Sequence, residues 1–333
     1  MLQRLDTTSA PRKFLLAKDP LSPPPGLAGA AVAIGNFDGV HRGHCAVIER
    51  AQHLAHKLKA PCAALTFEPH PGDFFRGPNT VFRLTPPDAK ARALERLGID
   101  GMIILTFDEA LARLSAEAFT AEILKCRLGI SAAVAGYNFH FGAGRSGSPE
   151  FLKDAGRRLG FAVDIVERVP ASGGAANEAA SSTSARAALE AGNVALAAEL
   201  LGHPYFILGN VVAGERRGRN LGFPTANVVP DPSCRLRHGV YAVRAIIGSE
   251  AFDGVASYGR RPTFDNGRAL LETFLFDFSG GLYGETIEVR FVAWLRAEAK
   301  FASSEALIAQ MRDDEKQAKE ILRGRAIEPA RGG

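Results

Sequence analysis

The stretch GAAVAIGNFDGVHRGH, residues 29–44, decides how the first half of this chain folds. It opens with a short run of small and branched apolar residues, which is typical of a buried strand. A glycine-rich turn follows, and the apolar residues of the next stretch, 44–60, recur near the helical period. The pattern predicts a strand, a tight turn and a helix, in that order.

The same alternation of strand and helix patterns continues along the chain. Strands are expected within 61–71, 100–107, 131–136 and 161–169, and helices within 85–98, 115–129 and 148–160. Such alternation favours right-handed crossovers and a parallel sheet with helices on both faces. For the first thirty residues, an irregular lead and an extra strand both stay open.

The second half of the chain has a different pattern. A helical pair is expected over 184–192 and 193–202, with Asn193 as the N-cap of its second member. From residue 203 onward, short apolar runs are separated by glycine turns, which predicts a small antiparallel barrel or sandwich. A charged amphipathic helix over 303–322, capped by Ser303 or Ser304, ends the pattern.

Composition limits the class of protein. A length of 333 residues suits two domains, and a formal net charge of +4 is too small for a general nucleic-acid coat. The four cysteines form no C-x-x-C pair, which favours reduced thiols over a zinc site or a disulfide scaffold. The first twenty residues lack the apolar centre of a secretory signal, and no run is long enough to cross a bilayer. We expect a soluble, cytoplasmic protein with no nucleic-acid or membrane partner.

The glycine-rich turn is the first candidate site, because ligands of a doubly wound sheet lie at the carboxyl ends of its strands. Gly35 and Gly39 allow close backbone approach, and the following helix offers free N–H groups and a positive dipole end. His41 and His44 lie on one helical face, where two imidazole donors point toward a triphosphate and offset the charge of a departing pyrophosphate. The alternative is that both histidines only cap the helix or lie on its surface.

Sequence motifs narrow the possibilities. The turn is neither a G-x-x-x-x-G-K-[ST] loop nor a G-x-G-x-x-G fingerprint. HRGH at 41–44 resembles the H-x-G-H signature of the nucleotidylyltransferase superfamily. Together with TFEPHP at 66–71, GYNFHFGAGRSG at 136–147 and SSTSAR at 181–186, it resembles the bacterial bifunctional riboflavin kinase/FAD synthetase family.

This resemblance implies a Rossmann-like nucleotidylyltransferase domain that transfers AMP from ATP to FMN, with His41 and His44 as catalytic residues. Asn138 is implied on the adenine-nucleotide or flavin side of the pocket, and Ser182, Thr183 and Arg186 in a mobile loop that meets the phosphates. The forked guanidinium of Arg186 suits phosphate oxygens. The nucleotide- or flavin-binding positions implied are Gly35, Phe37, Asp38, Gly39, His70, Asn138, Ser182, Thr183 and Arg186.

Two features of these motifs qualify the resemblance. His70 lies between two prolines and is alternatively a rigid loop residue without a ligand. Ser184 and Ala185 stand where the family commonly has Arg and Ile, so a positive charge is missing there. We expect this difference to weaken the handling of ATP or pyrophosphate without abolishing it.

A second candidate site lies in GRNLGFPTANV, residues 218–228. In an extended segment Thr225 and Asn227 share one face, and their oxygen atoms suit a hard cation such as Mg²⁺. Phosphoryl transfer to an alcohol also needs a group that takes the hydroxyl proton, and Glu272, in an otherwise apolar strand, is the candidate. Its alternative is an ordinary outward-facing strand residue. The residues expected at the nucleotide phosphates are Gly218, Arg219 and Gly222.

The second half resembles the riboflavin kinase domain of the same family through RGRNLGFPTAN, HGVYAV, GVASYGRRPTF, LETFLFDF, LYGETIEVRFVAWLR and KFASSEALIAQM. This resemblance implies a six-stranded antiparallel β-barrel closed by a C-terminal helix. It also implies Mg²⁺ and ATP contacts at Thr225 and Asn227, and a general base at Glu272. The expected domains are an FMN adenylyltransferase at 1–187, a helical linker at 188–204 and a riboflavin kinase at 205–325.

The implied enzyme phosphorylates riboflavin to FMN and then adenylylates FMN to FAD, with Mg²⁺ as cofactor and ATP, riboflavin and FMN as substrates. One alternative is a barrel that binds RNA through its basic loop, which the modest net charge disfavours. The other is a cytidylyl- or pantetheine-type transferase with an unrelated barrel. Self-association, nucleotide preference and direct passage of FMN between the sites stay open.

Overall fold

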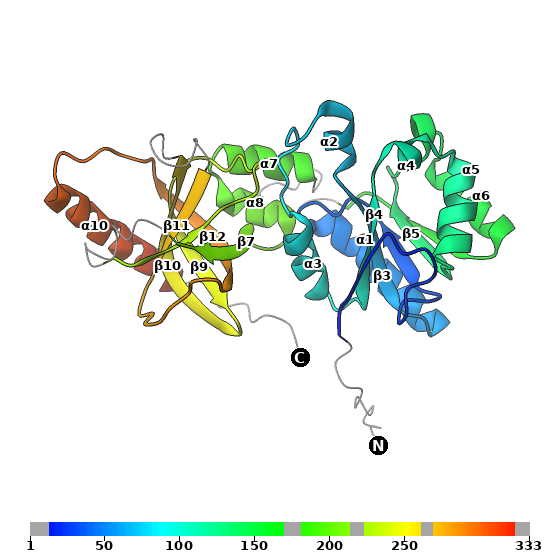
Figure 1. Cartoon of the computed structure of the whole chain (residues 1–333), viewed down its shortest axis with the longest axis horizontal. Helices are drawn as coiled ribbons and strands as arrows, with labels where there is room; N and C mark the ends of the chain where they lie inside the picture. The colour runs from blue at the N-terminus through cyan, green and yellow to red at the C-terminus, as the bar shows by residue number, and fades with distance from the viewer. Residues whose placement is uncertain (1–12, 170–180, 214–222, 261–268, 324–333) are drawn as a thin grey trace, which may run out of the picture.

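The computed structural model describes residues 13–169, 181–213, 223–260 and 269–323 of the chain. These residues form a parallel-sheet unit and a barrel unit, which lie side by side with a pair of helices near their junction (Figure 1). The two expected architectures are therefore confirmed.

The sheet of the first unit is entirely parallel, and its strand order is β1-β4-β3-β2-β5-β6. From β2 the chain first builds β3 and β4 on one side, and then crosses to β5 and β6 on the other. The carboxyl end of β2 is therefore a topological switch point, where such sheets bind ligands. The strands are β1 (Leu15–Lys18), β2 (Ala31–Ile34), β3 (Cys62–Glu68), β4 (Gly101–Thr106), β5 (Ala132–Gly136) and β6 (Ala162–Val166).

Helices cover both faces of this sheet, and the alternation of β2 shows why. Ala31 and Ala33 join an apolar cluster with α1 (Arg42–Leu58) and α3 (Pro87–Glu95), whereas Val32 and Ile34 join a cluster on the opposite face. Helix α6 (Pro149–Leu159) and the π-helix η1 (Phe119–Arg127) contribute to that second cluster. The shorter helices are α2 (Pro71–Arg76), α4 (Glu109–Arg113), α5 (Ala116–Ala118) and the 3₁₀ turn η2 (Ala143–Arg145).

Two local features differ from the sequence expectation. Strand β1 lies in the stretch that was left open, and it pairs parallel with β4 at the edge of the sheet. The helix expected over 115–129 continues from α5 as a π-helix. Near this change the Thr120 hydroxyl donates to the carbonyls of Ala116 and Glu117, and so competes with the backbone amides for their acceptors.

The second unit is a closed antiparallel barrel formed by six strands of the described residues, in the order β10-β11-β8-β7-β12-β9. Its interior is filled by apolar side chains that alternate along the strands, such as Val228, Leu271 and Val289. The strands are β7 (Phe206–Val212), β8 (Thr225–Val228), β9 (Gly239–Ile247), β10 (Glu250–Arg260), β11 (Ala269–Leu275) and β12 (Thr286–Arg296).

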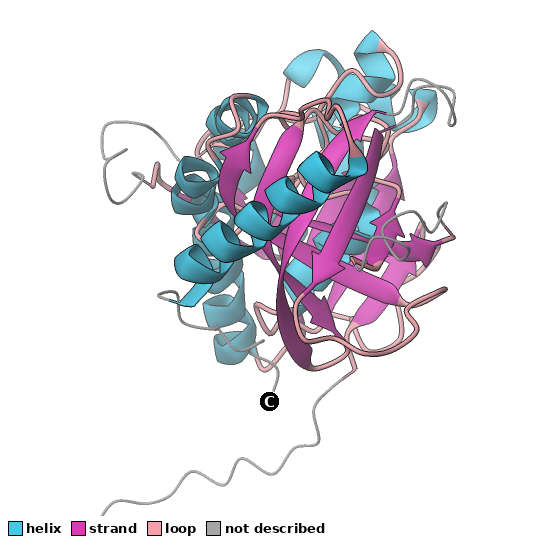
Figure 2. Ribbon diagram, turned by 90° about the vertical axis from the view of Figure 1, so that its left-hand side faces the viewer, coloured by secondary structure: helices cyan, strands magenta, loops and turns pink. Residues whose placement is uncertain are grey.

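The C-terminal helix α10 (Ser304–Arg323) crosses the outside of this barrel (Figure 2). Ala318 and Leu322 pack against Ala242, and the Asp314 carboxylate binds Arg296 through two hydrogen bonds of 2.7 Å. The Ser303 hydroxyl accepts from the amide of Ala306, so Ser303 is the cap. Within the described ranges no helix is both long and apolar enough to cross a membrane.

Helices α7 (Ser182–Glu190) and α8 (Val194–Leu201) connect the two units. Asn193 caps α8 as expected, with its side-chain oxygen 3.0 Å from the amide of Leu196. Both helices share one apolar cluster with the barrel interior and with Phe82 and Leu84 of the first unit. The expected boundary at 187/188 falls inside α7, and both helices of the expected linker region pack in the same apolar cluster as the barrel core.

Candidate active sites

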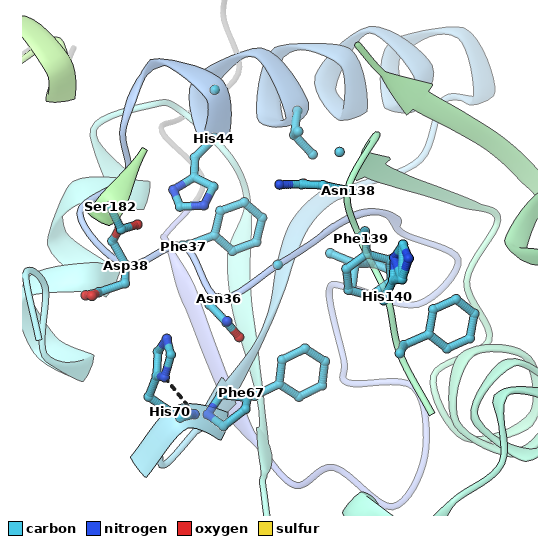
Figure 3. A pocket seen from close by; sticks show the side chains of 18 of the residues that line it. Asn36, Phe37, Asp38, His44, Phe67, His70, Asn138, Phe139, His140 and Ser182 are labelled. Atoms are coloured by element: carbon cyan, nitrogen blue, oxygen red, sulfur yellow. Dashed lines mark hydrogen bonds between the residues drawn. The ribbon is translucent and has the colours of Figure 1, made fainter. Parts of the chain in front are cut away.

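The first unit contains a cavity of about 940 Å³ at the carboxyl edge of the sheet. Segments that follow β2, β3, β4, β5 and β6 all line it, as expected for a switch-point site. Figure 3 shows side chains entering it from several of these segments. Of the expected residues, those that line it are Gly35, Phe37, Asp38, His41, His44, His70, Asn138, Ser182, Thr183 and Arg186.

The turn after β2 has an unusual backbone. Phe37, Gly39 and Val40 all have positive φ, at 47°, 82° and 40°. Each non-glycine residue in this region costs about 1–3 kcal/mol, and a β-branched residue is rare there. Gly39 does not line the cavity, since its amide donates to the Thr85 hydroxyl at 2.8 Å on the other side of the turn.

His41 and His44 occupy the start of α1. The Nδ1 atom of His41 accepts a hydrogen bond of 3.3 Å from the His44 amide, which makes His41 the N-cap. The two rings stack with their centroids 3.7 Å apart. The capping alternative is therefore correct for His41, yet both rings also line the cavity. The first-turn amides of Arg42 and Gly43 precede any intrahelical acceptor and provide the positive end of the helix.

Both imidazoles are neutral near pH 7. Burial lowers the pKa of His41 from 6.5 to about 4; the Asp38 carboxylate opposes this effect, and Arg186 adds a smaller reduction. Burial also lowers the pKa of His44 well below 6.5, helped by His41 and Lys90. Because Nδ1 of His41 accepts from an amide, its single proton lies on Nε2. His41 is therefore a neutral N–H donor and not a cation.

His70 repeats this arrangement. Its Nδ1 accepts from the Gly72 amide at 3.0 Å and caps α2, which is the dashed contact near His70 in Figure 3. Burial lowers the pKa of His70 to about 4, against the opposing effect of Asp38 and with a smaller reduction from Arg83. Its proton consequently lies on Nε2. His70 thus caps α2 and also lines the cavity, and its contact with a ligand stays a prediction.

Asp38 and Arg186 form an ion pair beside the cavity. The Asp38 carboxylate is almost fully buried and also accepts the Thr85 amide at 2.9 Å. Arg186 donates through Nε to the Phe82 carbonyl at 2.7 Å. The forked guanidinium is thus bound to protein acceptors through Nε and Nη2, and it joins the β2 turn to α7.

The SSTSAR motif is helical and not the expected loop. Ser181 caps α7, and Ser182 and Thr183 lie in its first turn. The hydroxyl of Ser184 lies 3.1 Å from that of Ser181 and outside the cavity lining, while Ala185 is fully buried in the cluster shared with the barrel. The effect of the missing positive charge at Ser184 stays a prediction. At Ala185 the difference from the family is a matter of packing.

A buried ionic cluster lies close to the histidines, which sequence reasoning did not predict. Lys90 is only 1% exposed and donates to Glu68 at 2.8 Å and to the Thr66 hydroxyl at 3.2 Å. Arg83 binds the same Glu68 carboxylate. Burial lowers the pKa of Lys90, against the opposing effect of Glu68. The Thr66 hydroxyl donates in turn to the carbonyl of Asn36, so this cluster supports the β2 turn.

Aromatic side chains form a further part of the cavity wall. Phe139 and Phe141 stack on each other with centroids 5.3 Å apart, and both line the cavity. Phe75, which is 70% exposed, lies edge-on to Phe107. The sequence signal that was available is an aromatic residue at or just after the ends of β3, β4 and β5. The aromatic residues of the wall are Phe37, Phe67, Phe75, Phe107, Phe119, Tyr137, Phe139 and Phe141.

The second candidate site lies on the barrel. Glu272 of β11 stands directly opposite Asn227 of β8, and Phe274 stands opposite Thr225. Opposed residues of an antiparallel pair share a face, so Thr225, Asn227 and Glu272 lie together. Their neighbours Ala226 and Leu271 fill the interior, which places this group on the outer face. The structure thus brings the three expected residues together.

The chemistry of this group fits a hard cation. Asn227 is 7% exposed, and its Oδ1 atom has no hydrogen-bond partner within the described ranges. A buried carbonyl oxygen without a partner is costly, and a cation would satisfy it. The Thr225 hydroxyl, on the same face, is another oxygen donor of the kind that Mg²⁺ prefers. Gly218, Arg219 and Gly222 lie outside the described residues.

Comparison with known proteins assigns a family to each of the two units. Residues 24–183 match the FAD synthetase family model, and residues 201–322 match the riboflavin kinase model. A crystal structure from Streptococcus pneumoniae, described as that of a macrolide-efflux protein, is similar, with a TM-score of 0.78 and 31% identity. That similarity covers 92% of this chain and 99% of the other.

Relatives with both units are closely similar in sequence. The bifunctional riboflavin kinase/FMN adenylyltransferase of Haemophilus influenzae is 39% identical over 294 residues, which cover 88% of this chain and 94% of that protein. The Escherichia coli protein of the same name is 40% identical over 295 residues, with 88% and 93% covered. An unrelated barrel appended to another transferase is thereby excluded. The resemblance drawn from the motifs is confirmed, and the chain belongs to the bifunctional riboflavin kinase/FMN adenylyltransferase family.

Proposed function

We propose that the barrel unit of this chain phosphorylates riboflavin with ATP to give FMN and ADP, and that the parallel-sheet unit adenylylates FMN with ATP to give FAD and pyrophosphate. The observation that carries this proposal is that the two units of one chain contain two different sets of functional groups. Neutral imidazoles at a helix N-terminus line the cavity of one unit, and oxygen ligands stand opposite a carboxylate in the other.

In adenylyl transfer, a phosphate oxygen of FMN attacks the α-phosphorus of ATP and the bond to pyrophosphate breaks. The ATP phosphates lie along the β2 turn and the first turn of α1, where Gly35 allows close approach. The Nε2–H groups of His41 and His70 donate to phosphate oxygens, and the His44 ring lies beside them. These donors are aligned before the reaction and stabilise the charge that builds up on the phosphates.

Substrate rings fit the rest of the cavity. The isoalloxazine ring is flat and aromatic, and edge or face contacts with the phenylalanines of the wall suit it. Asn138 enters the cavity from the end of β5 and provides an amide for the adenine-nucleotide or flavin side (Figure 3). Ser182 donates to the Asp38 carbonyl at 2.8 Å, so it keeps the turn in place beside the phosphates. Thr183 and Arg186 complete that side of the cavity.

In riboflavin phosphorylation, Glu272 takes the proton of the terminal ribityl hydroxyl as the hydroxyl oxygen bonds to the γ-phosphorus of ATP. The bond from the γ-phosphorus to the bridging oxygen breaks, and ADP leaves. Thr225 and Asn227 hold Mg²⁺ on the same face as this carboxylate. When bound, Mg²⁺ neutralises phosphate charge and fixes the position of the triphosphate. Gly218, Arg219 and Gly222 are proposed to cover the phosphates. The proposed functional limits are 1–187 for the adenylyltransferase and 205–325 for the kinase, with the helical linker 188–204 between them.

The test is a time course with purified protein, riboflavin, ATP and Mg²⁺, in which flavins are separated by chromatography. FMN should accumulate first and then decline as FAD and pyrophosphate appear. Protein supplied with FMN in place of riboflavin should begin to make FAD without a lag. Absence of FMN and FAD from folded protein would contradict both assignments.

A further inference from the structure

The β2 turn is not stabilised by its own unit alone. Three of its residues have positive φ, and two of them, Phe37 and Val40, are not glycine. A backbone of this kind persists only where surrounding groups hold it. Within the first unit, Thr85 binds the Gly39 amide at 2.8 Å, and its own amide donates to Asp38 at 2.9 Å. These contacts fix the amide side of the turn and the Asp38 side chain.

The carbonyl side of the turn is held by residues that come much later in the chain. The Ser182 hydroxyl donates to the Asp38 carbonyl at 2.8 Å, and Nε2 of His203 lies 3.1 Å from the Gly39 carbonyl. Packing is equally tight, since a Cβ atom on Gly39 would lie 3.0 Å from Leu201. His203 and Leu201 both fall within the stretch that matches the riboflavin kinase model. His203, a residue of the riboflavin kinase match, therefore contacts the β2 turn, which lines the cavity of the first unit.

Each nitrogen of the His203 ring faces a carbonyl oxygen, but the neutral ring carries only one proton to donate. Nδ1 lies 2.9 Å from the Pro204 carbonyl, and burial lowers the pKa of the ring, so that it is neutral. A neutral imidazole donates through one nitrogen only. The Nε2–H tautomer holds Gly39, whereas the Nδ1–H tautomer bonds to the neighbouring carbonyl of its own segment and leaves Gly39 without this donor.

We propose that His203 is a positioning residue for adenylyl transfer, whose Nε2–H holds the Gly39 carbonyl and so fixes the turn that presents His41 to the phosphates. His203 lies on the far side of this turn and touches no substrate, because it is absent from the residues that line the cavity. The inference rests on the proposed adenylyl transfer at this cavity. On this inference, residues from both the FAD synthetase match and the riboflavin kinase match build the adenylylation site.

The test compares three full-length variants. In His203→Gln the side-chain amide nitrogen takes the place of Nε2, in His203→Asn it takes the place of Nδ1, and His203→Leu keeps volume without a donor. We expect His203→Gln to retain most of the rate of FAD formation from FMN. His203→Asn and His203→Leu should lower kcat about tenfold, with the KM for ATP nearly unchanged, because alignment and not binding is lost.

Two controls separate positioning from general damage. Riboflavin phosphorylation should stay at the wild-type rate in all three variants. Arg235→Met removes another contact between the units, the 2.8 Å bond from Arg235 to the Thr80 carbonyl, and should change neither reaction. Equal rates for the Asn and Gln variants, a change in KM alone, or parallel losses in both reactions would overturn the inference. Wild-type protein that makes no FAD would overturn the proposed function and, with it, this inference.

Discussion

The His41 and His44 rings stack face to face, with centroids 3.7 Å apart and planes inclined by 18°. Phe37 meets the His44 ring edge-on, with ring centroids 5.2 Å apart. Two imidazoles this close repel each other when both are protonated, so stacking and burial act together to keep them neutral. The pair is therefore aligned as hydrogen-bond donors near pH 7 without carrying charge.

The first prediction concerns this protonation. His41 should stay neutral from pH 8 down to about pH 5 and titrate near its lowered pKa of about 4. Ring resonances followed by NMR across this range, with His41→Gln to assign the signal, provide the measurement. A His41 transition near 6.5, the ordinary value, would contradict the proposed neutral donor.

Stability should depend on pH in the same direction. His41 has a pKa of 6.5 in the unfolded chain but only about 4 in the folded protein. Protons therefore bind preferentially to the unfolded chain between these values, and the free energy of unfolding decreases as the pH drops from 6.5 to 4. Urea unfolding midpoints should decline from pH 6.5 to pH 4, and less steeply in His41→Gln. An equal decline in both proteins would argue against His41 as a contributor.

The second prediction concerns the imidazole pair. His41→Ala combined with His44→Ala should stall the reaction at FMN, since FAD formation loses about 10²- to 10³-fold when aligned donors are removed. Riboflavin phosphorylation should be unaffected. The matched control is His53→Ala with His56→Ala, because both of these histidines lie exposed on the same helix. Control protein that also stalls at FMN would mean that α1 itself had been damaged.

The third prediction concerns Glu272. Glu272→Gln keeps the shape of the side chain but removes the base, so FMN formation should fall about 10²- to 10⁴-fold. Conversion of supplied FMN to FAD should continue at the wild-type rate. Glu250→Gln, an exposed position on β10 of the same barrel, should leave both reactions intact. A fully active Glu272→Gln protein would refute the assignment.

The fourth prediction concerns the buried pair between Asp38 and Arg186. Asp38→Asn leaves Arg186, which is 19% exposed, without its carboxylate partner and should lower the free energy of unfolding by about 3 kcal/mol. The control is Glu109→Gln, which breaks an exposed pair with Arg113 and should cost under about 0.5 kcal/mol. Urea unfolding of the full-length proteins measures both. Similar decreases in the free energy of unfolding in the two variants would show that the ion pair of Asp38 stabilises the fold no more than an exposed pair does.

The sequence predicted those features that depend on neighbours along the chain. The strand, turn and helix at 29–58 follow from local apolar spacing. Asn193 and Ser303 could be predicted as caps because each side chain accepts from an amide only three residues further along the chain. The shared face of Thr225 and Asn227 follows from strand alternation. In each case the physical cause lies within a few residues.

Features that join distant segments could not be read from the sequence. Arg186 and Asp38 are 148 positions apart, and the family resemblance implied a phosphate contact for Arg186 but not this ion pair. Strand β1 is only four residues long, and it pairs with a strand more than eighty positions away. The register that sets Glu272 opposite Asn227 likewise depends on the folded barrel. Only packing of the whole chain decides such contacts.

The most direct test of two separate sites is to mix the two inactive proteins. The His41→Ala/His44→Ala variant and the Glu272→Gln variant should each fail to convert riboflavin to FAD alone. Mixed in equal amounts with riboflavin, ATP and Mg²⁺, they should produce FAD, because FMN released by the first is adenylylated by the second. No FAD from the mixture of folded proteins, or FAD from either variant alone, would contradict the account.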